Sequence, residues 1–141
     1  MPSIFVPTTP EGQARPRLLK SGAVHSPISA FRQAGFVEAF DKRPAAPLDG
    51  PLRLEVDFIC PRPASTPARQ VLKWTKPDVD NLLKGAMDAL KDARWCVDDG
   101  RFCEVQSRKR YPLSGEFVGA AITVVPLRDP AWKTSKGAIT P

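Results

Sequence analysis

Sixteen prolines are spread along the 141 residues of the chain, and they limit how long any helix or strand can be. Proline lacks a backbone donor, so helix interiors and central strands exclude it. Between the prolines we expect a strand at 3–6, a loop or irregular hairpin at 8–24, a helix at 26–40, a linker at 44–51, a strand at 52–60, a loop at 61–75, a helix at 78–93, and strands at 101–111 and 117–125.

Two of these segments have a clear periodicity. Between Leu52 and Cys60 apolar and polar residues alternate, which predicts a strand with one apolar face. Between Asp78 and Ala93 the apolar residues repeat at three- and four-residue steps, which predicts an amphipathic helix. The first helix is expected to start at Ser26-Pro27, with serine as N-cap. Its buried stripe would consist of Ile28, Phe31, Phe36 and Ala39.

The order of these elements, β, α, β, α, β, β, predicts an α+β fold in which a small mixed β-sheet packs with two main helices. The last two strands would form a hairpin around a turn at Pro112-Leu113-Ser114-Gly115. Residues 1–126 are expected to make a single domain. Residues 127–141 lack periodicity and are expected to be a flexible, basic C-terminal tail.

The charge and the cysteines narrow the class of protein. A formal charge of +6 and a pI of about 9.6 favour an acidic partner, most commonly nucleic acid. Three cysteines without a C-x-x-C motif argue against a disulfide framework and favour a reduced, intracellular protein. The chain begins without a signal-peptide pattern, and no apolar run approaches membrane-spanning length.

Acidic residues gather at both ends of the second helix. Asp78 and Asp80 lie one residue apart at its start, and Asp98-Asp99 follow its end. Neighbouring carboxylates repel each other unless a cation is shared, and Mg²⁺ prefers such oxygen ligands. If the hairpin packed beside the helix start, three carboxylates would suit metal-assisted phosphodiester hydrolysis. Lys84, about one turn from Asp80, could then stabilise the transition state or the leaving oxygen.

Each of these residues also has a plainer explanation. Asp78 could serve only as a helix N-cap. Asp80 and Lys84 could form only a surface i,i+4 pair, worth a few tenths of a kcal/mol. Asp98-Asp99-Gly100 could be only a turn.

The combination is more specific than its parts. An Asp-x-Asp-Asn-x-x-Lys helix start at 78–84 is followed by Asp88-Ala89-Leu90, Trp95, the Asp98-Asp99 pair and a basic strand. This run, from Lys76 to Tyr111, resembles the RusA family of Holliday junction resolvases. Arg15-Pro16-Arg17 is similar to a segment that precedes the first helix in phage-type members. One departure is Gly100, where many members have serine or alanine.

The resemblance implies a homodimeric endonuclease that uses Mg²⁺, with Mn²⁺ as a substitute, and nicks two opposed strands of a four-way DNA junction. It implies Asp78, Asp80 and Asp99 as catalytic metal ligands, with Asp98 as the alternative to Asp99, and Lys84 as the essential lysine. It also implies a cytoplasmic, nucleoid-associated protein of bacterial, phage or prophage origin.

A junction resolvase must hold several phosphate backbones, mostly through salt-dependent contacts. Two symmetric nicks suit a closed two-fold dimer. Two alternatives stay open: a metal-dependent nuclease acting on forks, flaps or other DNA, and a non-catalytic nucleic-acid-binding protein. The residues expected to contact DNA are Arg15, Arg17, Lys20, Arg69, Lys73, Lys76, Arg108, Lys109 and Arg110, with Arg62 in the same loop.

Overall fold

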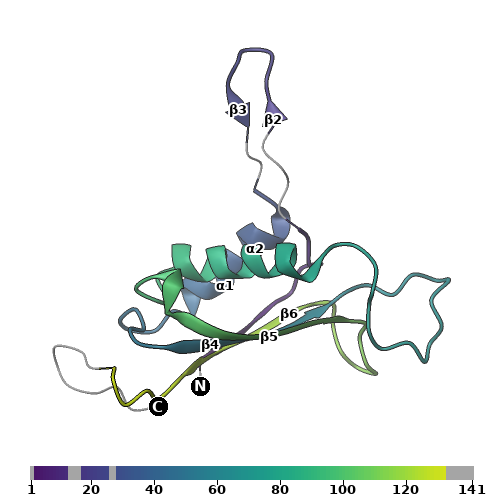
Figure 1. Ribbon diagram of the computed structural model, residues 1–141. Coiled ribbons are helices and arrows are strands. Elements are labelled where there is room, and N and C mark those ends of the chain that lie inside the picture. Colours follow the sequence, from purple (N-terminus) through teal and green to yellow (C-terminus); the bar gives the residue numbers. More distant parts are fainter. Residues whose placement is uncertain (1, 13–16, 26–27, 133–141) are drawn as a thin grey trace.

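The computed structural model describes residues 2–12, 17–25 and 28–132. Both main helices cover one face of a four-stranded sheet, and a two-stranded hairpin stands away from the helix layer (Figure 1). This arrangement confirms the expected α+β class. In chain order the elements are β1 (Ser3–Val6), β2 (Arg17–Leu18), β3 (Val24–His25), α1 (Ala30–Asp41), β4 (Leu52–Ile59), α2 (Val79–Asp92), the 3₁₀ turn η1 (Asp99–Arg101), β5 (Phe102–Arg110) and β6 (Gly119–Pro126).

The sheet is mixed, with strand order β1-β6-β4-β5. β4 runs parallel to β5 and antiparallel to β6, and β6 runs antiparallel to β1. The expected hairpin of β5 with β6 is therefore wrong, because β4 lies between them. The turn exists, with the Glu116 N–H donating to the Leu113 carbonyl at 3.0 Å, but it carries the chain past the end of β4. β4 and β6 are the two inner strands, each with a neighbour on both sides.

The core lies between β4 and the helices. The alternate residues Leu52, Leu54, Val56 and Phe58 are all buried, as the alternation predicts. They pack against the apolar stripe of α2, whose buried members include Leu82, Ala86 and Leu90. Trp95, just after α2, is also buried, and its indole N–H donates to the Ala39 carbonyl at 2.6 Å. This bond joins the chain after α2 to the end of α1.

The first helix differs from its prediction at both its start and its face. Ser26 and Pro27 lie outside the described residues, and the helix is capped by Ser29, whose hydroxyl accepts from the Arg32 N–H at 3.1 Å. The buried row is Phe31, Gly35 and Ala39. Ile28 and Phe36 are exposed instead. A Cβ at Gly35 would lie 3.3 Å from the Ala89 Cβ, so α1 rests close against α2 and turns a single row inward.

The first part of the expected tail packs on the domain. The Leu127 N–H donates to the Pro51 carbonyl at 2.9 Å, and the Arg101 guanidinium lies 5.0 Å from the centroid of the Trp132 ring. Residues 133–141 lie outside the described part, so a flexible tail stays a prediction for them. Within the described ranges, neither α1 nor α2 combines the length and apolar character that crossing a membrane requires.

Candidate active site

Asp78 stands at the N-terminal end of α2 as its N-cap residue, with extended backbone angles (φ −69°, ψ 144°). Its side chain makes no capping hydrogen bond. Both of its carboxylate oxygens instead accept from the Lys76 ammonium, each at 2.9 Å. This contact holds the pKa of Asp78 below its ordinary value, and the charge of Lys109 adds to the effect. The plainer explanation of Asp78 as a capping side chain is therefore not met.

Asp80 lies in the first turn of the same helix end and is exposed. One of its oxygens accepts from the Asn81 backbone N–H at 3.0 Å. Among the described residues, no ion pair joins Asp80 to Lys84, although four residues along a helix correspond to a rise of only about 6 Å. Lys84 is also exposed. The helix start thus presents two carboxylates and a lysine to solvent.

The segment that leads into this helix end is fixed from the sheet. The ammonium of Lys109, on β5, donates to the Thr75 carbonyl at 2.6 Å and to the Pro77 carbonyl at 2.8 Å. The Lys73 N–H donates to the Lys109 carbonyl at 3.0 Å, and the Lys76–Pro77 peptide bond is cis. Lys109 therefore holds the approach to Asp78 as a positioning residue, and its expected contact with DNA stays a prediction.

Asp98 and Asp99 lie at the opposite end of α2. The helix has 14 residues, so it is about 21 Å long. η1 follows the C-terminal end of the helix, and β5 then runs back until Lys109 reaches the N-terminal end. Within one protomer Asp99 therefore does not meet Asp78 and Asp80. Across the described residues, no three acidic, histidine or cysteine side chains gather in a way that could hold a metal ion.

The expectation that all three carboxylates converge in one chain depended on a β5–β6 hairpin beside the helix start. Because β5 runs parallel to β4, its first residue lies at the far end of the sheet from Asp78. The Asp98–Asp99 pair forms its own local structure, in which the Arg101 N–H donates to the Asp98 carbonyl at 3.1 Å. The pKa of Asp98 lies below its ordinary value. The larger cause is a hydrogen bond with the Asp99 side chain, and a hydrogen bond from the Gly100 backbone adds to it.

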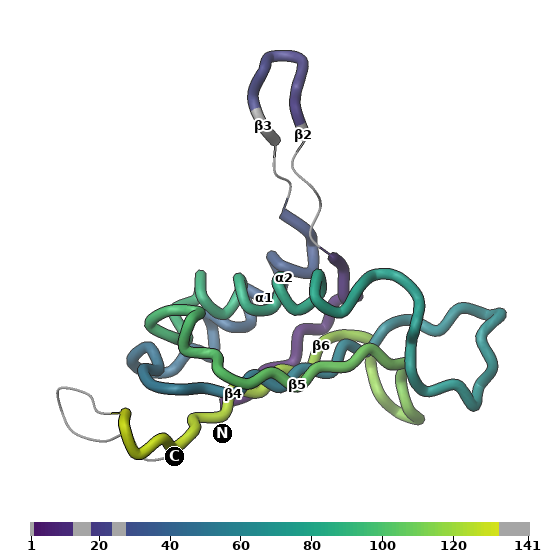
Figure 2. Tube along the Cα trace, in the orientation of Figure 1, coloured from purple at the N-terminus to yellow at the C-terminus, as the bar shows by residue number. Residues whose placement is uncertain are grey.

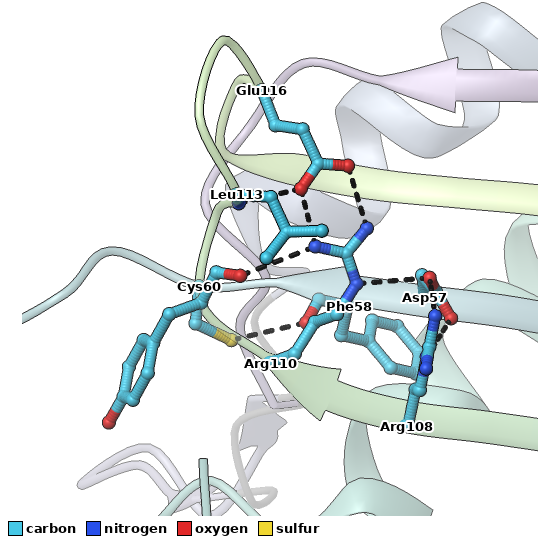
Figure 3. A network of polar contacts seen from close by, with 8 residues as sticks. Asp57, Phe58, Cys60, Arg108, Arg110, Leu113 and Glu116 are labelled. Carbon is cyan, nitrogen blue, oxygen red and sulfur yellow. Dashed lines mark hydrogen bonds and ion pairs between the residues drawn. The ribbon is translucent and has the colours of Figure 1, made fainter. Parts of the chain in front are cut away.

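Two of the expected DNA-binding arginines belong to a polar network at the end of β5 (Figure 3). Arg108 donates to both Asp57 oxygens, at 2.9 and 3.0 Å. Arg110 donates to Glu116 at 2.6 and 2.8 Å and to Asp57 at 3.1 Å. With only 6% of its surface exposed, Arg110 is placed as a structural residue, which corrects the expectation for it. The hydrogen bond between Arg110 and Glu116 lowers the pKa of Glu116 to about 2.

The other expected DNA contacts are distributed over two parts of the surface. Lys20 is exposed on the β2–β3 hairpin. Arg15 lies outside the described residues, and the side chain of Arg17 in β2 is not described. Arg69, Lys73 and Lys76 lie on the loop before α2, where Lys73 donates to the Thr75 hydroxyl at 2.8 Å and lies 5.8 Å from the Tyr111 ring centroid.

A contact that sequence reasoning missed ties the N-terminal segment to the helix start. Gly12 lies so close to α2 that a Cβ atom on it would overlap the side-chain amide of Asn81. β2 begins five residues further along the chain. The described N-terminal segment, residues 2–12, therefore ends beside the start of α2. The only sequence signal was the glycine itself, since close approach of two segments often requires one.

Comparison with known proteins shows which class of protein this chain belongs to. The family model described as endodeoxyribonuclease RusA matches residues 7–124, a range that contains both helices, β4 and β5. The protein is thus an endodeoxyribonuclease by family, a hydrolase of phosphodiester bonds.

The chain belongs to the RusA family. It is also similar to a protein of Bacillus subtilis (strain 168) described as uncharacterized protein YqaN, with 32% identity over 117 residues, which is 72% of this chain and 82% of that protein.

Proposed function

We propose that this protein is a Mg²⁺-dependent, structure-selective endonuclease that resolves four-way DNA junctions by paired symmetric nicks in recombination and repair. The observation that carries the proposal is the exposed pair Asp78 and Asp80 at the start of α2, where the Asp78 side chain makes no capping hydrogen bond. Lys109 holds the Pro77 carbonyl, one residue before Asp78, and the chain belongs to the RusA family.

The carboxylate pair fits the metal. Mg²⁺ is usually bound through one or two carboxylates, keeps several waters and takes substrate phosphate oxygens as further ligands. Asp78 and Asp80 supply oxygen ligands of this kind from one helix turn. When bound, the metal would ionise a water and neutralise charge that develops on the phosphate. Lys84 would lie beside the reacting phosphate, where its ammonium stabilises the leaving oxygen.

The family implies Asp99 as a third metal ligand. Asp99 lies too far from Asp78 and Asp80 of its own protomer to bind the same metal ion. Mg²⁺–oxygen bonds are about 2.1 Å long, whereas α2 alone separates the two ends by about 21 Å. In the proposed function the protein is a two-fold homodimer, and each site combines Asp78, Asp80 and Lys84 of one protomer with the partner subunit's Asp99. A closed two-fold arrangement makes two such sites, one for each nick.

The test uses end-labelled four-way, forked and linear duplex DNA, each with and without Mg²⁺. Wild type should nick the junction at two symmetric positions only when Mg²⁺ is present, and Asp80→Asn should reduce this cleavage at least 100-fold, on the order of what a catalytic group contributes. Asp92→Asn is the matched control. It removes an exposed aspartate from the far end of the same helix, where Asp92 pairs with Arg32 at 2.9 Å.

The other outcomes separate the alternatives. Faster cutting of forks than of four-way junctions would replace the proposal with a nuclease for other branched DNA. Full activity in Asp80→Asn would remove the acidic pair from the chemistry. Junction binding without cleavage under any metal condition would favour a non-catalytic DNA-binding protein.

A further inference from the structure

The loop between β4 and α2 carries an unusually exposed aromatic side chain. Trp74 has 75% of its surface exposed, and Leu72, two residues before it, has 52%. Exposed large apolar side chains that lie together mark an interaction site more often than single ones do. Together with Pro67, Arg69, Gln70 and Val71, these two residues line an open hollow of about 590 Å³.

The backbone around Trp74 is well anchored, so its exposure is built into the fold. On one side the Tyr111 N–H donates to the Val71 carbonyl at 2.8 Å, and the Lys73 N–H donates to the Lys109 carbonyl at 3.0 Å. On the other side the Lys109 ammonium holds the Thr75 carbonyl at 2.6 Å. Bonds on both sides fix the main chain to β5 and leave the indole in solvent.

The rest of the loop is also fixed. Arg62 donates from one guanidinium nitrogen to the Pro67 carbonyl at 2.6 Å and to the Gln70 carbonyl at 2.8 Å, and it lies 4.8 Å from the Tyr111 ring centroid. The loop projects beyond the end of the sheet, at the end where α2 begins (Figure 2). A rigid aromatic platform beside the helix start follows from these contacts.

The charge around the platform identifies its occupant. From residue 62 to residue 76 the chain has four cations, Arg62, Arg69, Lys73 and Lys76, and no acid. A positively charged groove with an aromatic side chain is the combination that binds a nucleic-acid strand, because phosphates pair with the cations and a base stacks on the ring. Trp74 is four residues from Asp78, a reach of at most about 14 Å.

A base inside a duplex is covered on both faces by its neighbours, so only an unpaired or displaced base can stack on a protein side chain. We infer that Trp74 is a stacking platform for an unpaired DNA base at the branch point, and that it selects branched over duplex DNA for the carboxylate pair. This inference rests on the proposed action on branched DNA and adds the residue that would recognise the branch.

The experiment measures binding without cleavage. In an Asp80→Asn background and without divalent metal, the affinities for a labelled four-way junction and for a duplex of the same sequence are compared by fluorescence anisotropy. Trp74→Ala should weaken junction binding by about 5- to 150-fold, the range that removal of one base–aromatic stack gives. Duplex affinity should change by less than about twofold, since the phosphate contacts remain. Trp74→Phe should restore most of the junction affinity.

Phe117→Ala is the matched control, because Phe117 is an equally exposed aromatic (79%) on the loop between β5 and β6. It should leave both affinities unchanged. A second readout is tryptophan emission. Junction binding should quench it in the Asp80→Asn protein and in its Phe117→Ala derivative, and much less in its Trp74→Phe derivative.

Three results would overturn the inference: equal losses for junction and duplex, no loss for either, or a Trp74→Ala protein that has lost its dimer in sedimentation. The last result would assign the platform to a second copy of the chain. Because these assays need no catalysis, a wild type that cuts nothing with Mg²⁺ would refute the proposed function and leave the stacking test intact.

Discussion

The separation of Asp99 from Asp78 and Asp80 leads to a prediction about mixed dimers. Asp80→Asn and Asp99→Asn proteins should each be inactive as homodimers. When the two are mixed in equal amounts and allowed to exchange subunits, random pairing makes about half of the dimers mixed. In a mixed dimer, one site receives both substitutions and the other receives none, because Asp80 and Asp99 enter the same site from different protomers.

The expected activity of the mixture follows from this fraction of mixed dimers. Half of the dimers each have one intact site out of two, so about one quarter of all sites should be active. If instead each protomer built its own site, every site in the mixture would carry one substitution, and no activity would return. The 14-residue helix is the reason for the difference, because its length of about 21 Å exceeds any metal–ligand distance by an order of magnitude.

The assay is a supercoiled plasmid that extrudes a cruciform. Wild type nicks both opposed strands and should give linear DNA. A mixed dimer has one working site and should give nicked circles, at about a quarter of the wild-type rate of strand cleavage. The control mixes Asp80→Asn with Asp78→Asn, two substitutions that fall in the same half-site, so that no mixed dimer gains an intact site. Activity in that control, or none in the test mixture after verified subunit exchange, would refute the assignment of Asp99 to the partner.

Two further predictions follow from the polar contacts of β5. Lys109→Met should remove both hydrogen bonds that hold Thr75 and Pro77. Because each charge-assisted bond is worth about 1.5–3 kcal/mol, we expect a several-degree loss in Tm. The loss in cleavage should be larger than the loss in junction affinity. Unchanged cleavage would contradict a positioning role. The pKa of Glu116 is lowered to about 2 from an ordinary 4.5, so its stabilising contribution is present above pH 4.5 and disappears as the pH falls towards 2. Tm measured from pH 7 to pH 2 should fall less steeply in Glu116→Gln than in wild type over that window, and parallel curves would count against the network.

The sequence predicted the elements whose periodicity is strong. The alternation in β4 and the apolar stripe of α2 both lie where they were expected, since burial of these residues is decided by the nearest layer. The face of α1 was less predictable. Phe36 looks as well suited to a core as Phe31, but its ring packs against Phe40 at 5.7 Å on the surface. The close approach at Gly35, which no local pattern reveals, decides which row is buried.

The sequence shows how the candidate site residues are spaced along the chain, but it does not show how the fold assembles them. The spacing of Asp78, Asp80 and Lys84 along one helix is a local property, so it could be read directly. The place of Asp99 depends on whether β5 pairs with β6 or with β4, and a turn between two apolar segments suggests the wrong partner. The roles of Lys109 and Arg110 depend on Thr75, Pro77, Asp57 and Glu116, which are remote in sequence and become neighbours only in the folded chain.

The length of α2 has a consequence for the spacing of the two cuts. In the proposed dimer, each site joins the start of one α2 to the segment beyond the end of the partner's α2. The distance between the two sites then equals the distance from Asp78 to Asp99 within a single chain. A single helix would thus serve as the spacer between the two scissile phosphates. Inserting one helical turn would move the two sites about 5 Å further apart without altering either set of ligands.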